Sequence, residues 1–209
     1  HLRVGAALGA DHRRHAVGIG VDERGADLRV VALGRVGLGG VADGGDDDLA
    51  LGRAPRVCAR PARYIYPPGE LPNETVPVLT DPFAITGPFH LVLLGTKAHQ
   101  TPDVAPWLAA ACGPDTDVVV LQNGITHRDR VEPLIGLASL VPAVVNIPAD
   151  REAPGHVRVG FRRHLVVPDD EPGRRTAHRF TDTFLVVGTT TDWHTAAWRK
   201  LVMNAVVGT

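Results

Sequence analysis

The sequence predicts an α/β fold in which a Rossmann-like, doubly wound parallel sheet is followed by the start of a helical C-terminal domain. Continuous apolar runs rich in β-branched residues occur at 91–96 and 118–121, as in strands that are buried on both faces of a parallel sheet. Segments with helical signals separate these runs from each other and from later strand-like segments. Strands that alternate with helices form right-handed crossovers, which build a doubly wound sheet.

The helix expected after the first apolar run has clear signals at both ends. Pro102 and Asp103 suit a first helical turn, and a Gly-Pro pair at 113–114 would stop the helix. We therefore expect a helix over 101–112.

The second apolar run leads through the QNG tripeptide at 122–124 into a helix that reaches about residue 135. The remaining expected elements are strands at 76–80, 140–147, 156–160 and 164–167, a helix over 172–187, and a last helix that follows Asp192-Trp193.

The first 63 residues differ in composition from the rest of the chain. They hold 12 of the 23 glycines and none of the ten aromatic residues, and they show no sustained helical periodicity. We therefore expect an atypical Gly/Arg-rich segment of uncertain fold at 1–63, a Rossmann-like nucleotide-binding domain at 64–190, and the first helix of a truncated helical domain at 191–209. The chain begins with His1, which leaves open a fragment or a frame error before residue 64.

Charge and composition argue against several classes of partner. A formal net charge of -1 gives no electrostatic footprint for nucleic acid, and no apolar run approaches the roughly 20 residues that span a bilayer. Cys58 and Cys112 stand alone without a C-x-x-C pair, which favours a reducing cytoplasm. Ten histidines include an HRRH stretch at 12–15, but no ligand set with a zinc-like spacing surrounds it, so no metal site is expected.

Lysine occurs only at Lys97 and Lys200, against twenty arginines. An ammonium group can give up a proton where a guanidinium cannot, so each lysine is a candidate proton donor. Lys97 and Asn123 each follow the apolar run of a different strand, which predicts that both lie at the carboxyl edge of the sheet, where such folds bind ligands. Lys200 and Asn204 are four residues apart and would project from one helical face.

Each of these features also has a plainer interpretation. The two lysines are what an arginine-rich composition leaves over, Asn123 and Gly124 suit an ordinary turn or helix cap, and Lys200 with Asn204 suits the solvent side of an amphipathic helix.

Four short motifs, taken in order and separation, resemble the ketopantoate reductase family. They are GTKAHQ at 95–100, LQNG at 121–124, PGHV at 154–157 and WRKLVMN at 198–204, and the resemblance covers about residues 70–209. It implies a Rossmann domain followed by a helical domain like that of 6-phosphogluconate dehydrogenase relatives, in a cytoplasmic enzyme that is a homodimer at full length. The implied activity is NADPH-dependent reduction of 2-dehydropantoate, a small 2-oxo acid, to pantoate on the route to pantothenate and coenzyme A. The alternatives are a related Rossmann oxidoreductase for another small oxo or hydroxy acid, or a non-catalytic fragment of such an enzyme.

The resemblance also implies roles for single residues. Lys97 matches the lysine at the nicotinamide end of the cofactor, and Asn123 matches the asparagine between cofactor and substrate. Lys200 matches the catalytic lysine, and Asn204 matches an asparagine that binds substrate. Hydride delivery to a ketone carbon leaves negative charge on oxygen, which a positioned ammonium can stabilise and protonate.

The nearest candidate for the cofactor's pyrophosphate loop is GLGGVA at 37–42, which fits G-x-G-x-x-A after a strand-like run at 28–33. Gly37 and Gly39 are therefore candidate cofactor-binding residues. Three acids at 46–48 follow where a helix should begin, so weak cofactor affinity is expected. Gly208 stands where the family has a second substrate asparagine, and the chain ends one residue later, so the resemblance implies an incomplete chain with an atypical N-terminus.

Overall fold

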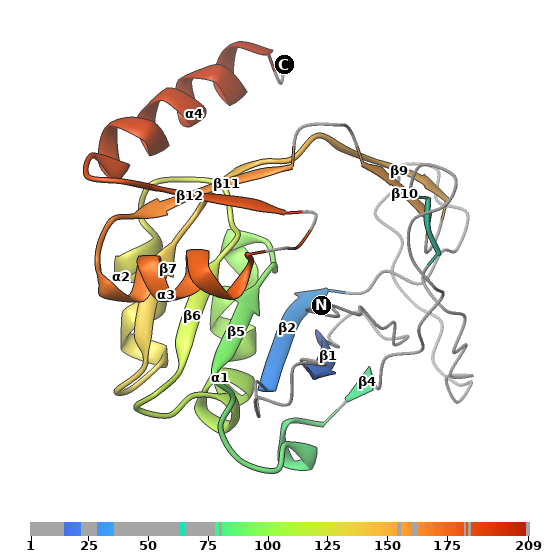
Figure 1. The fold of residues 1–209 in the computed structure, drawn as a ribbon. Coiled ribbons are helices and arrows are strands. Elements are labelled where there is room, and N and C mark those ends of the chain that lie inside the picture. Colours follow the sequence, from blue (N-terminus) through green and yellow to red (C-terminus); the bar gives the residue numbers. More distant parts are fainter. Residues whose placement is uncertain are drawn as a thin grey trace.

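A six-stranded sheet with helices on both faces forms the centre of the protein (Figure 1), and the prediction of an α/β fold with a parallel sheet is confirmed. The strand order is β4-β1-β2-β5-β6-β7. Neighbours are parallel along β2 (Arg29–Arg35), β5 (Leu91–Leu94), β6 (Asp117–Val120) and β7 (Ser139–Pro142). Strand β1 (His15–Val21) runs antiparallel to both β2 and β4 (Val78–Leu79). The computed structural model describes residues 15–21, 29–35, 63–65, 78–79, 81–153, 156–159, 163–181, 183 and 185–207.

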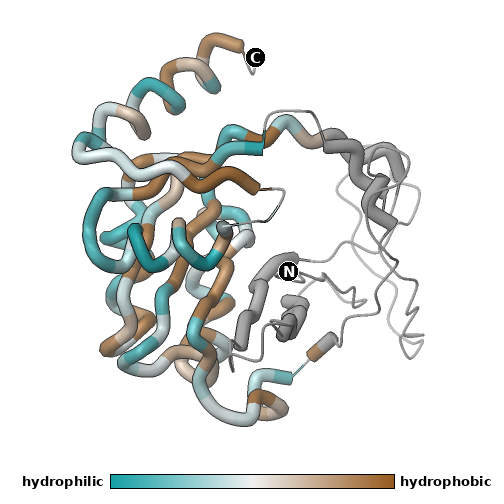
Figure 2. The backbone as a smooth tube through the Cα atoms, viewed as in Figure 1, coloured by the Kyte–Doolittle hydropathy of each residue, from teal (hydrophilic) through white to brown (hydrophobic). Residues whose placement is uncertain are grey.

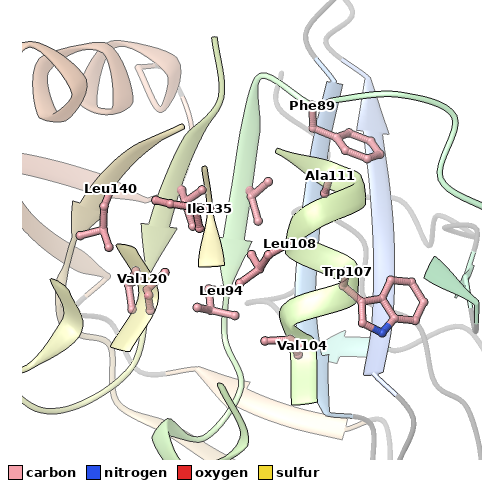
Figure 3. Close-up of a cluster of buried hydrophobic side chains, with 12 residues drawn as sticks. Phe89, Leu94, Val104, Trp107, Leu108, Ala111, Val120, Ile135 and Leu140 are labelled. Atoms are coloured by element: carbon pink, nitrogen blue, oxygen red, sulfur yellow. The ribbon is translucent and has the colours of Figure 1, made fainter. Parts of the chain in front are cut away.

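Strands β5 and β6 form the centre of the core because every one of their residues is buried. Alternate residues of a strand point to opposite faces, so each strand supplies both faces of the sheet. Val92 and Leu94 pack in the cluster around α1 (Ala105–Ala111), which Figure 3 shows. Leu91 and Leu93 belong to a second cluster on the other face. Figure 2 shows the same pattern as predominantly hydrophobic colouring along these strands.

The helices that cover the first face are short and partly of the 3-10 type. The helix expected over 101–112 is a 3-10 segment, Ala98–Val104, followed by α1. The next expected helix is α2 (His127–Val131), which continues as a 3-10 turn, Glu132–Leu134. A further 3-10 turn, Pro82–Ala84, precedes β5.

The single strand expected at 140–147 is two strands in two sheets. Strand β7 ends at Pro142, which has no backbone N–H to continue the ladder, and β8 (Val144–Asn146) turns into a second sheet. That sheet has the order β12-β11-β8, in which β11 (His164–Pro168) is antiparallel to β8 and parallel to β12 (Val186–Thr190).

The sequence predicted one helix over 172–187, and the second half of that prediction is wrong. Helix α3 (Glu171–Arg179) begins after Asp170, whose carboxylate accepts a hydrogen bond from the backbone N–H of Gly173, and it ends at Phe180. The hydroxyl of Thr183 then donates to the carbonyl of Phe180 and so supports a turn. The β-branched residues that follow pair as β12, because tertiary pairing with β11 overrides a helical interpretation of the segment.

A third sheet stands apart from the main one (Figure 1). It joins β3 (Arg63–Ile65), β10 (His156–Val159) and β9 (Ala149–Ala153), and β9 was not expected from the sequence.

The last helix, α4 (Trp193–Val207), contacts β8 and β11. Two strands of the main sheet, β1 and β2, come from the first 63 residues. The domain boundaries proposed from the sequence remain predictions. In the part of the chain that the structure describes, no helix is long and apolar enough to cross a membrane.

Candidate functional site

The carboxyl edge of the main sheet holds the first pair of predicted site residues. Strands β5 and β6 are parallel and in register, with Leu94 opposite Val120. Lys97 and Asn123 each lie three residues beyond this pair, so they occupy equivalent positions at adjacent strand ends, and both are exposed. The predicted placement of these two residues at one edge of one parallel sheet is confirmed.

Strand β2 ends at the same edge, because Leu33 is opposite Leu94 in the parallel pairing of β2 with β5. The strand-like run before the glycine segment is therefore a strand beside β5, as a pyrophosphate loop would require. Gly37 and Gly39 themselves lie outside the described residues.

The buried side chain of Gln122 joins the two strand ends. Its Nε2 donates to the hydroxyl of Thr101 at 2.9 Å and to the hydroxyl of Thr96 at 3.2 Å. The Thr101 hydroxyl in turn donates to the carbonyl of Ala98 at 2.9 Å. All three polar side chains are buried, and unsatisfied groups there would be costly, so this network holds the segment around Lys97 at a fixed distance from Asn123.

The backbone of Lys97 is fixed a second time by Gln100. The Lys97 N–H donates to Oε1 of Gln100 at 3.2 Å, and the Gln100 N–H donates to the Lys97 carbonyl at 2.9 Å. Gln100 is buried, so the chain at Lys97 is anchored while its ammonium group extends to the exposed side.

The loop after Asn123 depends on a glycine and an arginine. Gly124 has a φ of 116°, in the left-handed region that favours glycine, so the chain can turn sharply there. Arg130 donates to Oε1 of Gln122 at 3.3 Å and to the hydroxyl of Thr126. These contacts fold the loop back over the end of β6.

His127 lies beneath this loop and is almost completely buried. Its Nε2 is 2.7 Å from the backbone carbonyl of Gln122, and its ring makes an edge-to-face contact with Trp193. Burial lowers the pKa of His127 below its usual 6.5; the hydrogen bond to Gln122 opposes this effect, and the charge of Arg130 adds to it. The imidazole is therefore held in its neutral form near neutral pH.

The second predicted pair lies on α4. Lys200 and Asn204 are half-buried, on the helical face that also carries the buried Ala197. Val202 and Val206, on another face, are 55% and 71% exposed, so the polar pair faces the protein more than these apolar residues do. Helix α4 contacts β8 and β11, whereas Lys97 and Asn123 follow β5 and β6. The structure thus brings together the residues of each pair but forms no hydrogen bond between the pairs in its described part.

Sequence reasoning missed the residues that hold the site in place. Gln122 is part of the LQNG motif, and a polar residue directly after a buried strand is a usable signal. The family resemblance, however, implied a role only for Asn123. Thr96 and Thr101 gave no separate signal, because a threonine beside a strand end is common. His127 gave no signal either, because its contacts with Gln122 and Trp193 depend on tertiary structure.

Metal and thiol chemistry have no visible support within the described ranges. No group of three or more His, Cys, Asp or Glu residues there could hold a metal ion. Burial raises the pKa of the Cys112 thiol to about 12, so this thiol is unreactive at neutral pH.

In open α/β sheets of the Rossmann-like class, ligands bind outside the carboxyl ends of the strands, and this edge carries Lys97 and Asn123. A family model described as Ketopantoate reductase PanE/ApbA matches residues 50–171, and the chain belongs to this family. The resemblance inferred from the four motifs is thereby confirmed.

Individual relatives agree with this assignment. The 2-dehydropantoate 2-reductase of Mycobacterium tuberculosis (strain ATCC 25618 / H37Rv) is 34% identical over 164 residues, which cover 78% of this chain and 55% of the relative. The enzyme of the same name from Caulobacter vibrioides is 36% identical over 154 residues, or 71% and 52% of the two chains. The crystal structure of a PanE/ApbA family ketopantoate reductase from Ralstonia eutropha JMP134 is similar with a TM-score of 0.53 and 31% identity, over 60% of this chain and 41% of that one. The chain spans about half the length of the curated relatives it matches.

Proposed function

We propose that this protein reduces 2-dehydropantoate to pantoate with NADPH as its cofactor. The observation that carries the proposal is the placement of Lys97 and Asn123 at equivalent ends of two adjacent parallel strands, locked together by Gln122. Membership of the ketopantoate reductase family supplies the reaction that such an edge would serve.

The groups at this edge fit a nicotinamide cofactor. The exposed ammonium of Lys97 supplies positive charge, and the exposed amide of Asn123 can both donate and accept hydrogen bonds. Lys97 would hold the nicotinamide end, Asn123 would lie between cofactor and substrate, and Gly37 with Gly39 would approach the pyrophosphate. The bound cofactor supplies a hydride to the ketone carbon of the substrate.

The chain's own residues would manage the charge and the proton. Negative charge develops on the ketone oxygen, and the ammonium of Lys200 would stabilise it and donate the proton that completes the alcohol. Asn204, one helical turn further along the half-buried face of α4, would hold the substrate by hydrogen bonds. The carboxyl ends of β2 and β5 point toward the side of the molecule on which β11, β12 and α4 lie (Figure 1), which supports a site shared between these elements. We further propose that the reaction serves pantothenate and coenzyme A synthesis in the cytoplasm and that the enzyme is a homodimer.

The test is steady-state NADPH oxidation with 2-dehydropantoate by the wild-type chain and by substitutions at Lys200. Lys200→Ala should lower kcat by roughly a hundredfold or more, the scale of losing a general acid, and Lys200→Arg should restore little of it. Arg199→Ala, at an exposed neighbouring position of α4, is the matched control and should keep the wild-type kcat. An alanine variant that raises KM and leaves kcat unchanged would make Lys200 a binding residue and leave the reaction without its proton source.

The same assay decides between substrates and between cofactors. A panel of small 2-oxo acids and of NADPH against NADH should give the highest kcat/KM for 2-dehydropantoate with NADPH. A higher kcat/KM for another oxo acid would replace the substrate proposed here while keeping the reaction class. The acids at 46–48 predict weak cofactor binding, so a dissociation constant for NADPH in the low micromolar range or below would contradict that expectation.

A further inference from the structure

His127 connects the pair Lys97 and Asn123 with the pair Lys200 and Asn204, between which the described part of the chain forms no direct hydrogen bond. It begins α2, directly after the loop that carries Asn123 and Gly124, and its ring lies against Trp193. Trp193 is the first residue of α4, the helix that carries Lys200.

The first of its two contacts fixes the tautomer of the ring. A backbone carbonyl can only accept, so the nitrogen 2.7 Å from the Gln122 oxygen must be a protonated Nε2 that donates. The carbonyl belongs to the residue just before Asn123, and the side chain of the same residue bridges to Thr96 and Thr101. His127 therefore acts on the segment that sets the position of Asn123.

The other nitrogen makes a second proton unfavourable. Nδ1 is buried and has no hydrogen-bond partner among the described residues, so a proton there would be an unpaired donor in the interior. The guanidinium of Arg130, on the same helix, adds a repulsive positive charge. The ring is thus a neutral group in one fixed orientation.

The second contact of the ring reaches α4. The ring centroids of His127 and Trp193 are 5.5 Å apart at an interplanar angle of 66°, an edge-to-face arrangement typical of favourable aromatic pairs. Ala197 follows Trp193 by four residues and Lys200 follows Ala197 by three, so the three share one helical face. The place of this face therefore depends on where Trp193 rests.

We propose that His127 is a positioning residue that sets the place of α4, and with it Lys200, relative to Asn123 at the carboxyl edge of the sheet. This inference rests on the proposed function for its catalytic meaning. The two contacts predict two separable effects, since one acts on the Asn123 loop and the other acts on α4. A ring that only filled space would need neither the hydrogen bond to the Gln122 carbonyl nor a proton on Nε2.

Two substitutions each remove one contact. His127→Phe keeps an aromatic ring against Trp193 and removes the donor to Gln122, so we expect NADPH affinity to fall about tenfold while amide exchange in α4 stays within about twofold of wild type. His127→Gln keeps an N–H donor near Gln122 and removes the ring, so we expect nearly wild-type NADPH affinity. Amide exchange at residues 194–201 should then rise about tenfold, and kcat should fall by a similar factor.

The control is the other histidine and tryptophan pair of the same helix. His194 and Trp198 have ring centroids 6.2 Å apart at 69°, but both are exposed. His194→Gln should change neither α4 exchange nor NADPH affinity. Exchange in α3, measured in the same samples, separates a local effect on α4 from a general loss of stability.

The experiment has clear contrary outcomes. If His127→Phe binds NADPH as the wild type does, the hydrogen bond has no positioning role. If His127→Gln leaves exchange in α4 unchanged, the ring does not hold the helix. If both variants fail to fold, nitrogen-15 NMR of the wild-type chain still decides, because an Nδ1–H tautomer at His127 would overturn the proposal. A wild-type chain that reduces no 2-dehydropantoate would refute the proposed function alone, since exchange in α4 is measured without substrate.

Discussion

Helices α3 and α4 are held near opposite ends of β6 by different chemistry, since α3 binds Asp117 at the start of β6 and α4 contacts His127 after its end. At the amino edge, the buried carboxylate of Asp117 accepts hydrogen bonds from Nε and Nη2 of Arg175 at 3.2 and 2.7 Å, and a further one from Arg179. At the carboxyl edge, α4 meets α2 through the neutral ring of His127 against Trp193. Charge pairing thus fixes the first helix, and one aromatic contact contributes to the place of the second.

The two helices also differ in which residues they bury and which they expose. Helix α3 buries one residue in every three or four and is polar elsewhere, as Figure 2 shows by its hydrophilic colouring. Helix α4 has Ala197 as its only fully buried residue within the described range, and its exposed side includes Trp198, Val202 and Met203. The comparison suggests that α3 serves stability, whereas α4 is placed to present Lys200 and Asn204.

The largest effect on stability is expected at Asp117. Asp117→Ala would leave two arginines without their shared buried carboxylate. The expected cost is about 3 kcal/mol of unfolding free energy, the low end for a broken buried ion pair, because both arginine side chains reach solvent in part. The hydrogen bond to Asp117 raises the pKa of Arg175, which agrees with a strong pairing. Urea unfolding of the variant measures the change, with Asp115→Ala at an exposed neighbouring position as the control. Equal midpoints for the two variants would contradict a stabilising role for the amino edge.

The next effect concerns the first turn of α3. A Cβ at Gly173 would lie 1.9 Å from the backbone carbonyl oxygen of Pro168, so the helix would have to move away from β11. We expect Gly173→Ala to lower the unfolding free energy by about 2 kcal/mol, as overpacking does. Gly188→Ala is the control, because its Cβ would meet only the Leu165 oxygen at 4.0 Å. Thermal unfolding that ranks both variants alike would show that α3 is not closely fitted to its strand.

How far the sequence predicted these edges depends on whether a feature is local. Apolar runs identified β5 and β6, and their parallel order put Lys97 and Asn123 at one edge, because the carboxyl ends of parallel strands meet at the same edge of a sheet. The helix expected over 172–187 extended into the start of β12, since only pairing with β11 distinguishes strand from helix there. Asp117 and His127 gave no signal in the sequence, because the partners of Asp117 are 58 and 62 residues away and Trp193 is as distant from His127.

A smaller effect is expected where the carboxyl edge meets its ligand. Asn123 is exposed, so Asn123→Ala should change the unfolding free energy by no more than about 0.5 kcal/mol. Loss of its amide should weaken NADPH binding by about tenfold, the upper range for one hydrogen bond. Titration of NADPH fluorescence measures the affinity, and Asp129→Asn on the exposed side of α2 is the control. A variant that loses stability without losing affinity would reverse the contrast between the two edges.

The smallest effect is a pH dependence of the unfolding free energy that comes from His127, the residue that contacts α4. Because the folded protein lowers the pKa of His127 below 6.5, the unfolded chain binds this proton more readily than the folded one does. The contribution of His127 to stability is therefore fully present above pH 6.5 and declines as the pH falls below that value, by at most about 1.4 kcal/mol per pH unit. His127→Phe cannot take up this proton, so its stability should fall less between pH 7 and pH 5 than that of the wild type. Urea unfolding at a series of pH values gives the difference, in which the other nine histidines cancel. Parallel curves for the two proteins would mean that His127 binds its proton as readily in the folded state as in the unfolded one, and the neutral ring against Trp193 would then lose its physical basis.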